Sequence, residues 1–136
     1  GSVDIIAAIE EYAHEPLFRI FKNIPRDDFV KLMGVASVMV GNSSAALIEA
    51  PSFKLPVVNI GSRQMGRIRA KNIIDVALCE ENEIADAIDK ALSERFREEL
   101  KILKNPYVGG NASKKIVNVL KKVLLTNKFR KHFYDL

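Results

Sequence analysis

The sequence has few residues that bind metals or form disulfides. Its 136 residues include one cysteine, Cys79, two histidines, His14 and His132, and no tryptophan. A single cysteine cannot form a disulfide within the chain, and one cysteine with two histidines does not make a zinc cluster. Because Cys79 follows the apolar run 73–78, we expect a small core or sheet-edge residue rather than a reactive nucleophile.

Long apolar runs are also missing. No stretch approaches the roughly 18 apolar residues that a membrane-spanning helix needs. The N-terminus lacks the basic start and the long apolar segment of a signal peptide. With 48% apolar and 28% charged residues, the composition is that of a single globular domain. We therefore expect a soluble, cytoplasmic protein with no membrane partner.

The net charge of +4 comes from the C-terminal part of the chain. Residues 113–136 contain seven Lys and Arg residues and one acid, which leaves 14 basic and 16 acidic residues, a net charge of −2, over residues 1–112. Nucleic-acid binding is typical of basic domains, so we expect no nucleic-acid partner. The basic C-terminal residues either contact an acidic surface or another subunit, or form a solvated helix face. The second interpretation is favoured by four apolar residues that predict a core-facing helix stripe: Ile116, Val119, Leu120 and Val123.

Short apolar runs alternate with helical patterns along the chain. Apolar residues at three- and four-residue spacing predict helices, and short apolar runs bounded by turn residues predict strands. The predicted helices are 2–15, 25–36, 43–53, 81–94, 95–104 and 112–125, and the predicted strands are 17–21, 37–41, 56–60 and 72–78. This alternation indicates an α/β fold with a parallel sheet covered on both faces. A domain of this class normally opens on a strand, so the opening helix indicates either that the fold starts unusually or that the chain has been cut.

One stretch, GNSSAALIEAPSFKLPVVNIGSRQMGR at residues 41–67, combines groups that suit a nucleoside diphosphate. Ser43 and Ser44 follow a predicted strand at the start of a predicted helix, where free backbone amides can bind phosphate. The carboxylate of Glu49 can accept two hydrogen bonds from sugar hydroxyls. Three arginines, whose guanidinium groups suit a diphosphate, follow the next strand: Arg63, Arg67 and Arg69.

Each of these residues also has a purely structural interpretation. Ser43 and Ser44 can be no more than a helix cap, Glu49 can be a solvated helix residue, and the arginines can belong to a charged surface loop. Phe29, near the start of a predicted helix, is by default a core residue. Their occurrence together favours an anionic ligand with a sugar, although the spacing does not name the nucleotide.

A family resemblance lies in residues 40–76, VGNSSAALIEAPSFKLPVVNIGSRQMGRIRAKNIIDV. These residues resemble the C-terminal domain of UDP-N-acetylglucosamine 2-epimerases, particularly the hydrolysing branch that makes N-acetylmannosamine for sialic-acid synthesis. The similarity extends upstream through IFKNIPRDDFVKLMGVA and downstream to KNPYVGGNASKKIV, and so covers residues 2–122. The family has the two-domain GT-B architecture, with the sugar nucleotide between two Rossmann-like halves. The resemblance implies that residues 1–125 belong to the UDP-binding C-terminal half and that 126–136 form a basic tail.

The resemblance also implies a set of substrate-binding residues. Six residues match family positions at the UDP site: Phe29, Ser43, Ser44, Ala45, Glu49 and Arg67. In the family, the three-residue turn holds the diphosphate, the acid binds the ribose hydroxyls, the aromatic position lies beside the uracil, and the arginine follows the next strand. One departure is that Ala45 and Ala46 stand where relatives usually have a glycine.

The family reaction is an anti elimination of UDP from UDP-N-acetylglucosamine, which leaves a 2-acetamidoglycal. The hydrolysing branch then adds water and releases N-acetylmannosamine, without a metal or a redox cofactor. The family's catalytic carboxylates lie in the N-terminal domain, so the resemblance implies that this chain binds UDP, contains no catalytic residue, and is inactive alone. It implies a homo-oligomer for the full-length parent. Two alternatives remain: a GT-B glycosyltransferase that uses another sugar nucleotide, and a non-catalytic interaction module.

Overall fold

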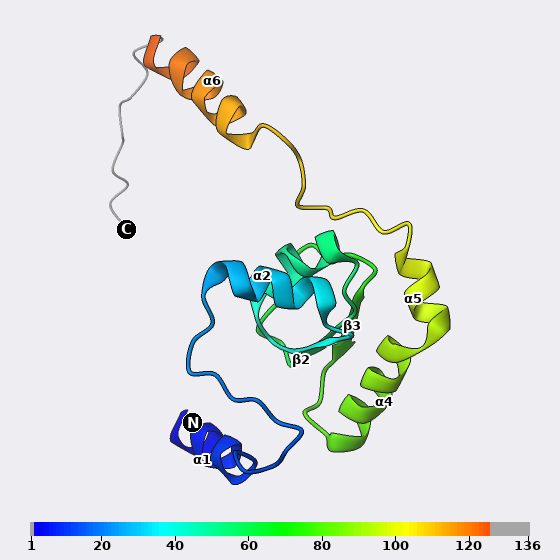
Figure 1. The fold of residues 1–136 in the computed structure, drawn as a ribbon. Coiled ribbons are helices and arrows are strands. Elements are labelled where there is room, and N and C mark those ends of the chain that lie inside the picture. The colour runs from blue at the N-terminus through cyan, green and yellow to red at the C-terminus, as the bar shows by residue number, and fades with distance from the viewer. Residues whose placement is uncertain (1, 126–136) are drawn as a thin grey trace, which may run out of the picture.

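The computed structural model describes residues 2–125 (Figure 1). In this part of the chain, helices and short strands alternate as the sequence predicts. The elements are α1 (Ser2–Glu11), α2 (Arg26–Val35), β1 (Met39–Gly41), α3 (Ser44–Ile48), the 3-10 turn η1 (Ala50–Phe53), β2 (Val57–Ile60), β3 (Ile73–Val76), α4 (Glu81–Leu92), α5 (Glu94–Leu100) and α6 (Ala112–Leu125). Within residues 2–125, no helix has the length and apolarity that crossing a bilayer requires. The predicted basic tail, 126–136, lies outside the described residues.

The three strands form a parallel sheet in the order β1-β2-β3. In this register Gly41 lies opposite Asn59, and Asn59 lies opposite Asp75. Parallel strands bring their carboxyl ends to the same edge of the sheet, where α/β proteins bind their ligands. The sheet and its flanking helices confirm the predicted α/β class.

Apolar side chains are buried on both faces of the sheet. The first core cluster joins β2 to α2, α3 and η1, and its fully or almost fully buried members are Met33, Ala46, Leu47, Ala50, Leu55 and Val57. The second core cluster joins the opposite face to α4, and its buried members are Val58, Val76, Ala87 and Ala91. Val57 and Val58 are neighbours in β2 and therefore point to opposite faces. Each face of this small sheet is thus covered by helical elements.

The prediction of a strand at residues 17–21 is wrong. This segment runs through turns and extended chain between α1 and α2 and pairs with no strand of the described sheet. Its apolar side chains remain exposed, with Leu17 94% exposed and Phe21 64% exposed. A strand is stable only when its backbone groups are hydrogen-bonded to a neighbour. The apolar pattern of residues 17–21 therefore does not make a strand in this chain.

The apolar stripe of α6 and Cys79 are both exposed, although the sequence predicts that they pack in the core or at a sheet edge. The helix predicted at 112–125 forms as α6, but Ile116 and Val119 are 58% and 59% exposed, so its apolar stripe does not pack on the core. In Figure 1, an extended stretch of chain separates α6 from the sheet. Cys79, expected in the core or at a sheet edge, is exposed beyond the end of β3.

Candidate functional site

Two loops begin at the carboxyl edge of the sheet. The first, residues 42–43, joins β1 to α3, and the second, residues 61–72, joins β2 to β3. Gly41 has a φ of +143° and Gly61 a φ of +74°. Side-chain-bearing residues rarely adopt either conformation, so glycine permits the chain to turn at both points.

The two loops are held together through Asn42. The Nε2 atom of Gln64 donates a hydrogen bond of 2.7 Å to the backbone carbonyl of Asn42. The Nη1 atom of Arg63 donates to the Oδ1 atom of Asn42 at 3.4 Å. The side chain of Gln64 is buried, which protects its hydrogen bond from competition by water. No sequence motif points to Gln64, because its position between two arginines is typical of a charged loop.

Ser43 caps α3, as its structural interpretation requires. Its Oγ atom accepts a hydrogen bond of 3.3 Å from the backbone amide of Ala45, and its extended backbone conformation is usual for a cap. Such a cap typically contributes about 1 kcal/mol. Ser43 is exposed, whereas Ser44 and Ala45 are half-buried. The three residues predicted to hold a diphosphate therefore lie in one turn, with Ser43 also serving the helix.

Glu49 lies at the end of α3 and forms an ion pair with Arg26, a residue that no sequence motif indicates. Its Oε2 atom is 2.6 Å from the Nη1 atom of Arg26, the first residue of α2. The carboxylate side chain is 25% exposed, and the arginine side chain is 66% exposed. Phe29 lies one turn further along α2 and packs against the first core cluster. Phe29 is therefore a core-packing residue, as its structural interpretation predicts.

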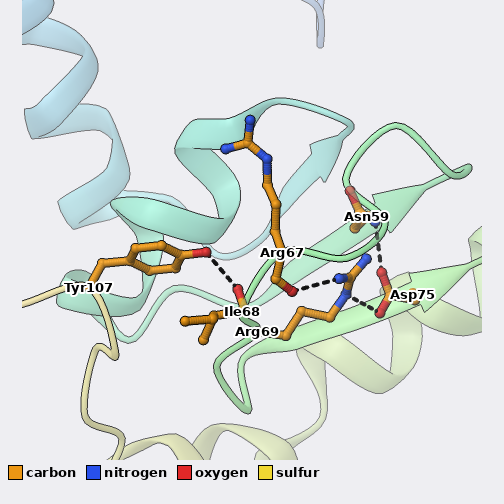
Figure 2. Close-up of polar contacts among 6 residues, drawn as sticks. All are labelled: Asn59, Arg67, Ile68, Arg69, Asp75 and Tyr107. Carbon is orange, nitrogen blue, oxygen red and sulfur yellow. Dashed lines mark hydrogen bonds and ion pairs between the residues drawn. The ribbon is translucent and has the colours of Figure 1, made fainter. Parts of the chain in front are cut away.

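The three arginines after β2 have different surroundings. Arg69 is engaged by the protein, because its Nε atom lies 2.8 Å from Oδ2 of Asp75 and its Nη1 atom donates to the carbonyl of Arg67 at 3.0 Å. Arg63 contacts Asn42, as described above. The guanidinium group of Arg67 extends away from Arg69 and Asp75 (Figure 2). Of the three arginines, Arg69 is thus held by Asp75, and Arg67 has the guanidinium group that points away from this pair.

Next to these loops, a buried amide is hydrogen-bonded to an exposed carboxylate. Asn59, fully buried in β2, donates from Nδ2 to Oδ1 of Asp75 at 2.7 Å. Asp75 therefore accepts from Asn59 and Arg69 together, and links the sheet to the Arg67 loop. No group of three or more His, Cys, Asp or Glu residues within 2–125 is arranged to hold a metal ion. The polar groups at this edge suit hydrogen bonding and anion binding.

The fold and the polar edge define the class of this domain. A parallel α/β sheet with turns and polar loops at its carboxyl edge is typical of Rossmann-like domains that bind nucleotides. The family model for UDP-N-acetylglucosamine 2-epimerase matches residues 2–121. The chain therefore belongs to the UDP-N-acetylglucosamine 2-epimerase family.

Individual relatives agree with this assignment. The chain is 35% identical to polysialic acid biosynthesis protein P7 of Escherichia coli over all of its own length and 35% of that protein. It is 42% identical to the GDP/UDP-N,N'-diacetylbacillosamine 2-epimerase (hydrolyzing) of Campylobacter jejuni over 87% of this chain and 30% of that protein. The chain thus spans about a third of the length of these relatives.

A solved structure supports the fold. The crystal structure of a protein named as a putative UDP-N-acetylglucosamine 2-epimerase, from Listeria monocytogenes, matches with a TM-score of 0.64. The match covers 98% of this chain and 36% of that one, at 20% sequence identity. The likeness is consistent with part of a GT-B-like domain, in line with the predicted fold.

Proposed function

We propose that this chain is the UDP-binding portion of a hydrolysing UDP-N-acetylglucosamine 2-epimerase. One observation carries the proposal. The residues that match the family's UDP site lie on α3, in the turn before it, and in the 61–72 loop, which is hydrogen-bonded to that turn. Ser43, Ser44 and Ala45 share that turn, and Glu49 follows the same helix. Arg67 lies in the neighbouring loop, which Gln64 ties to Asn42.

Each proposed role follows from the chemistry of the group. The hydroxyl and backbone amide groups of the turn at 43–45 suit the diphosphate, and the guanidinium of Arg67 adds the positive charge that a diphosphate requires. The Glu49 carboxylate accepts hydrogen bonds from the ribose hydroxyls. Arg26 holds that carboxylate in place before the ligand arrives. Phe29, on the same helix as Arg26, is the proposed neighbour of the uracil.

The chemical step is proposed for the longer protein. There UDP leaves by anti elimination, and water adds to the resulting 2-acetamidoglycal to give N-acetylmannosamine. The turn at 43–45 and Arg67 are proposed to stabilise the negative charge on departing UDP, which lowers the barrier to elimination. The catalytic carboxylates are proposed to lie outside this chain. Two relatives, from Campylobacter jejuni and Legionella pneumophila, carry the word hydrolyzing in their names, which supports the choice of branch. A place in sialic-acid synthesis, a homo-oligomeric parent and the absence of a cofactor remain predictions.

Calorimetric titration tests the proposed function on the chain itself. We expect UDP to bind at least about tenfold more tightly than either uridine or inorganic pyrophosphate, because only UDP engages the ribose-binding acid and the charged loop together. We expect no release of N-acetylmannosamine from UDP-N-acetylglucosamine by the chain alone. If UDP and pyrophosphate bind equally, the site recognises only an anion, and the proposal is wrong.

A further inference from the structure

A short segment after α5 contacts both sides of the candidate site. The Nδ2 atom of Asn105 donates to the carbonyl of Ile48 at 2.8 Å and to the Oγ atom of Ser52 at 2.7 Å. The hydroxyl of Tyr107 donates to the carbonyl of Ile68 at 2.9 Å (Figure 2). Two residues of one loop thus join the end of α3, beside Glu49, to the loop that carries Arg67.

The segment is itself held in a fixed turn. The Oδ1 atom of Asn105 accepts a hydrogen bond of 2.8 Å from the backbone amide of Tyr107, and the carbonyl of Asn105 accepts one of 3.3 Å from Val108. An asparagine side chain bonded to the backbone two residues ahead makes a compact local turn. The distance between the two anchoring side chains is therefore set within the loop.

The Arg67 loop is fixed on its other flank by the sheet. Arg69 donates to the carbonyl of Arg67 and pairs with Asp75, which accepts from the buried Asn59 (Figure 2). Arg69 thus holds the backbone carbonyl of Arg67, and Tyr107 holds the carbonyl of the next residue, Ile68. The Arg67 guanidinium takes no part in these hydrogen bonds. The backbone of Arg67 is therefore fixed, while its side chain is available to bind a ligand.

We propose that Asn105 and Tyr107 are positioning residues that set the spacing between Glu49 and Arg67. This inference rests on the proposed function, because it concerns how the UDP site is held. A nucleoside diphosphate depends on this spacing because its ribose and its diphosphate must be bound at the same time. Loss of the Tyr107 hydroxyl frees the Arg67 side of the site while the Glu49 side stays anchored through Asn105. Loss of this hydroxyl is therefore expected to weaken the binding of a nucleoside diphosphate and to leave the binding of the nucleoside unchanged.

The test is Tyr107→Phe, which removes one hydroxyl and keeps the ring. NMR titrations with UDP and with uridine are compared for the wild type and the variant. We expect the UDP dissociation constant to rise about fivefold, as for the loss of one hydrogen bond, and the uridine constant to stay unchanged. Tyr12→Phe is the matched control, since Tyr12 lies beyond α1 and contacts Phe18, and we expect it to leave both constants unchanged.

The outcomes separate this inference from the proposed function. If Tyr107→Phe binds UDP like the wild type while Glu49→Ala weakens it, the positioning role is wrong and the UDP site stands. If Tyr107→Phe weakens UDP and uridine equally, the residue supports the fold in general and the positioning role is again wrong. If the wild type binds no UDP, the proposed function fails, and the positioning role fails with it.

Discussion

Replacing Glu49 with alanine is expected to weaken UDP binding by at least about tenfold. Hydrogen bonds to a charged group typically contribute about 1.5–3 kcal/mol, and 1.4 kcal/mol corresponds to a tenfold change in the dissociation constant. Both ribose hydroxyls lose their acceptor in this variant. Uridine contains the same ribose, so its affinity falls by a similar factor. Calorimetry with both ligands measures the two changes.

The matched control for this prediction is Glu98→Ala. Glu98 lies on α5, and its carboxylate is 2.6 Å from the Nζ atom of Lys101, the same separation as in the pair of Glu49 and Arg26. Both substitutions remove an acid from an ion pair, but only one lies at the proposed site. We expect Glu98→Ala to bind UDP like the wild type. Equal UDP affinity in Glu49→Ala and the wild type would contradict the ribose-binding role.

Arg67→Ala distinguishes the two sides of the site. This change removes charge proposed to meet the diphosphate, so it weakens UDP and leaves uridine unaffected, whereas Glu49→Ala weakens both. Arg95→Ala is its control, because Arg95 is an exposed arginine on α5 whose partner is Glu99, at 3.4 Å. A loss of uridine affinity in Arg67→Ala would place the arginine near the nucleoside instead.

Leu47→Ala is expected to cost about 2–5 kcal/mol of unfolding free energy. Leu47 is fully buried in the first core cluster and belongs to the short helix α3. A helix of five residues is not stable by its own hydrogen bonds and depends on such packing. Because domains of this size are typically stable by only about 5–15 kcal/mol, this change removes a large share of the total. Urea unfolding followed by circular dichroism measures it.

Leu17→Ala is the control for the core prediction. Leu17 is 94% exposed, so the same chemical change is expected to alter the unfolding free energy by less than about 0.5 kcal/mol. Similar losses for the two variants would contradict the assignment of the core to the α3 face of the sheet.

The sequence predicted the sheet well because its strands are short apolar runs bounded by turn residues, and β2 is buried on both faces. The predicted strands 37–41, 56–60 and 72–78 contain β1, β2 and β3, and the predicted helix 112–125 coincides with α6. The failures at 17–21 and at the α6 stripe share one cause. Periodicity shows which residues are apolar, but it does not show whether another element of the chain lies against them.

The site was predictable where a residue's role depends on its immediate neighbours. Ser43 follows a strand and precedes a helix, so its capping role could be inferred from local sequence. The partners of Glu49 and Arg69 could not, since Arg26 lies 23 positions before Glu49 and Asp75 belongs to another element. Asn105 stands 57 positions from Ile48. Such contacts depend on how the sheet brings distant loops together.

The most direct test of the UDP site is a proton–nitrogen NMR spectrum of the chain recorded during titration with UDP. We expect saturable shifts in the backbone amide signals of Ser43, Ser44, Ala45 and Arg67. The amide signals of Ser93 and Phe96, which line a different surface cavity, serve as an internal comparison and are expected to stay unchanged. Shifts confined to Ser93 and Phe96, or no shifts at all, would contradict a UDP site at the carboxyl edge of the sheet.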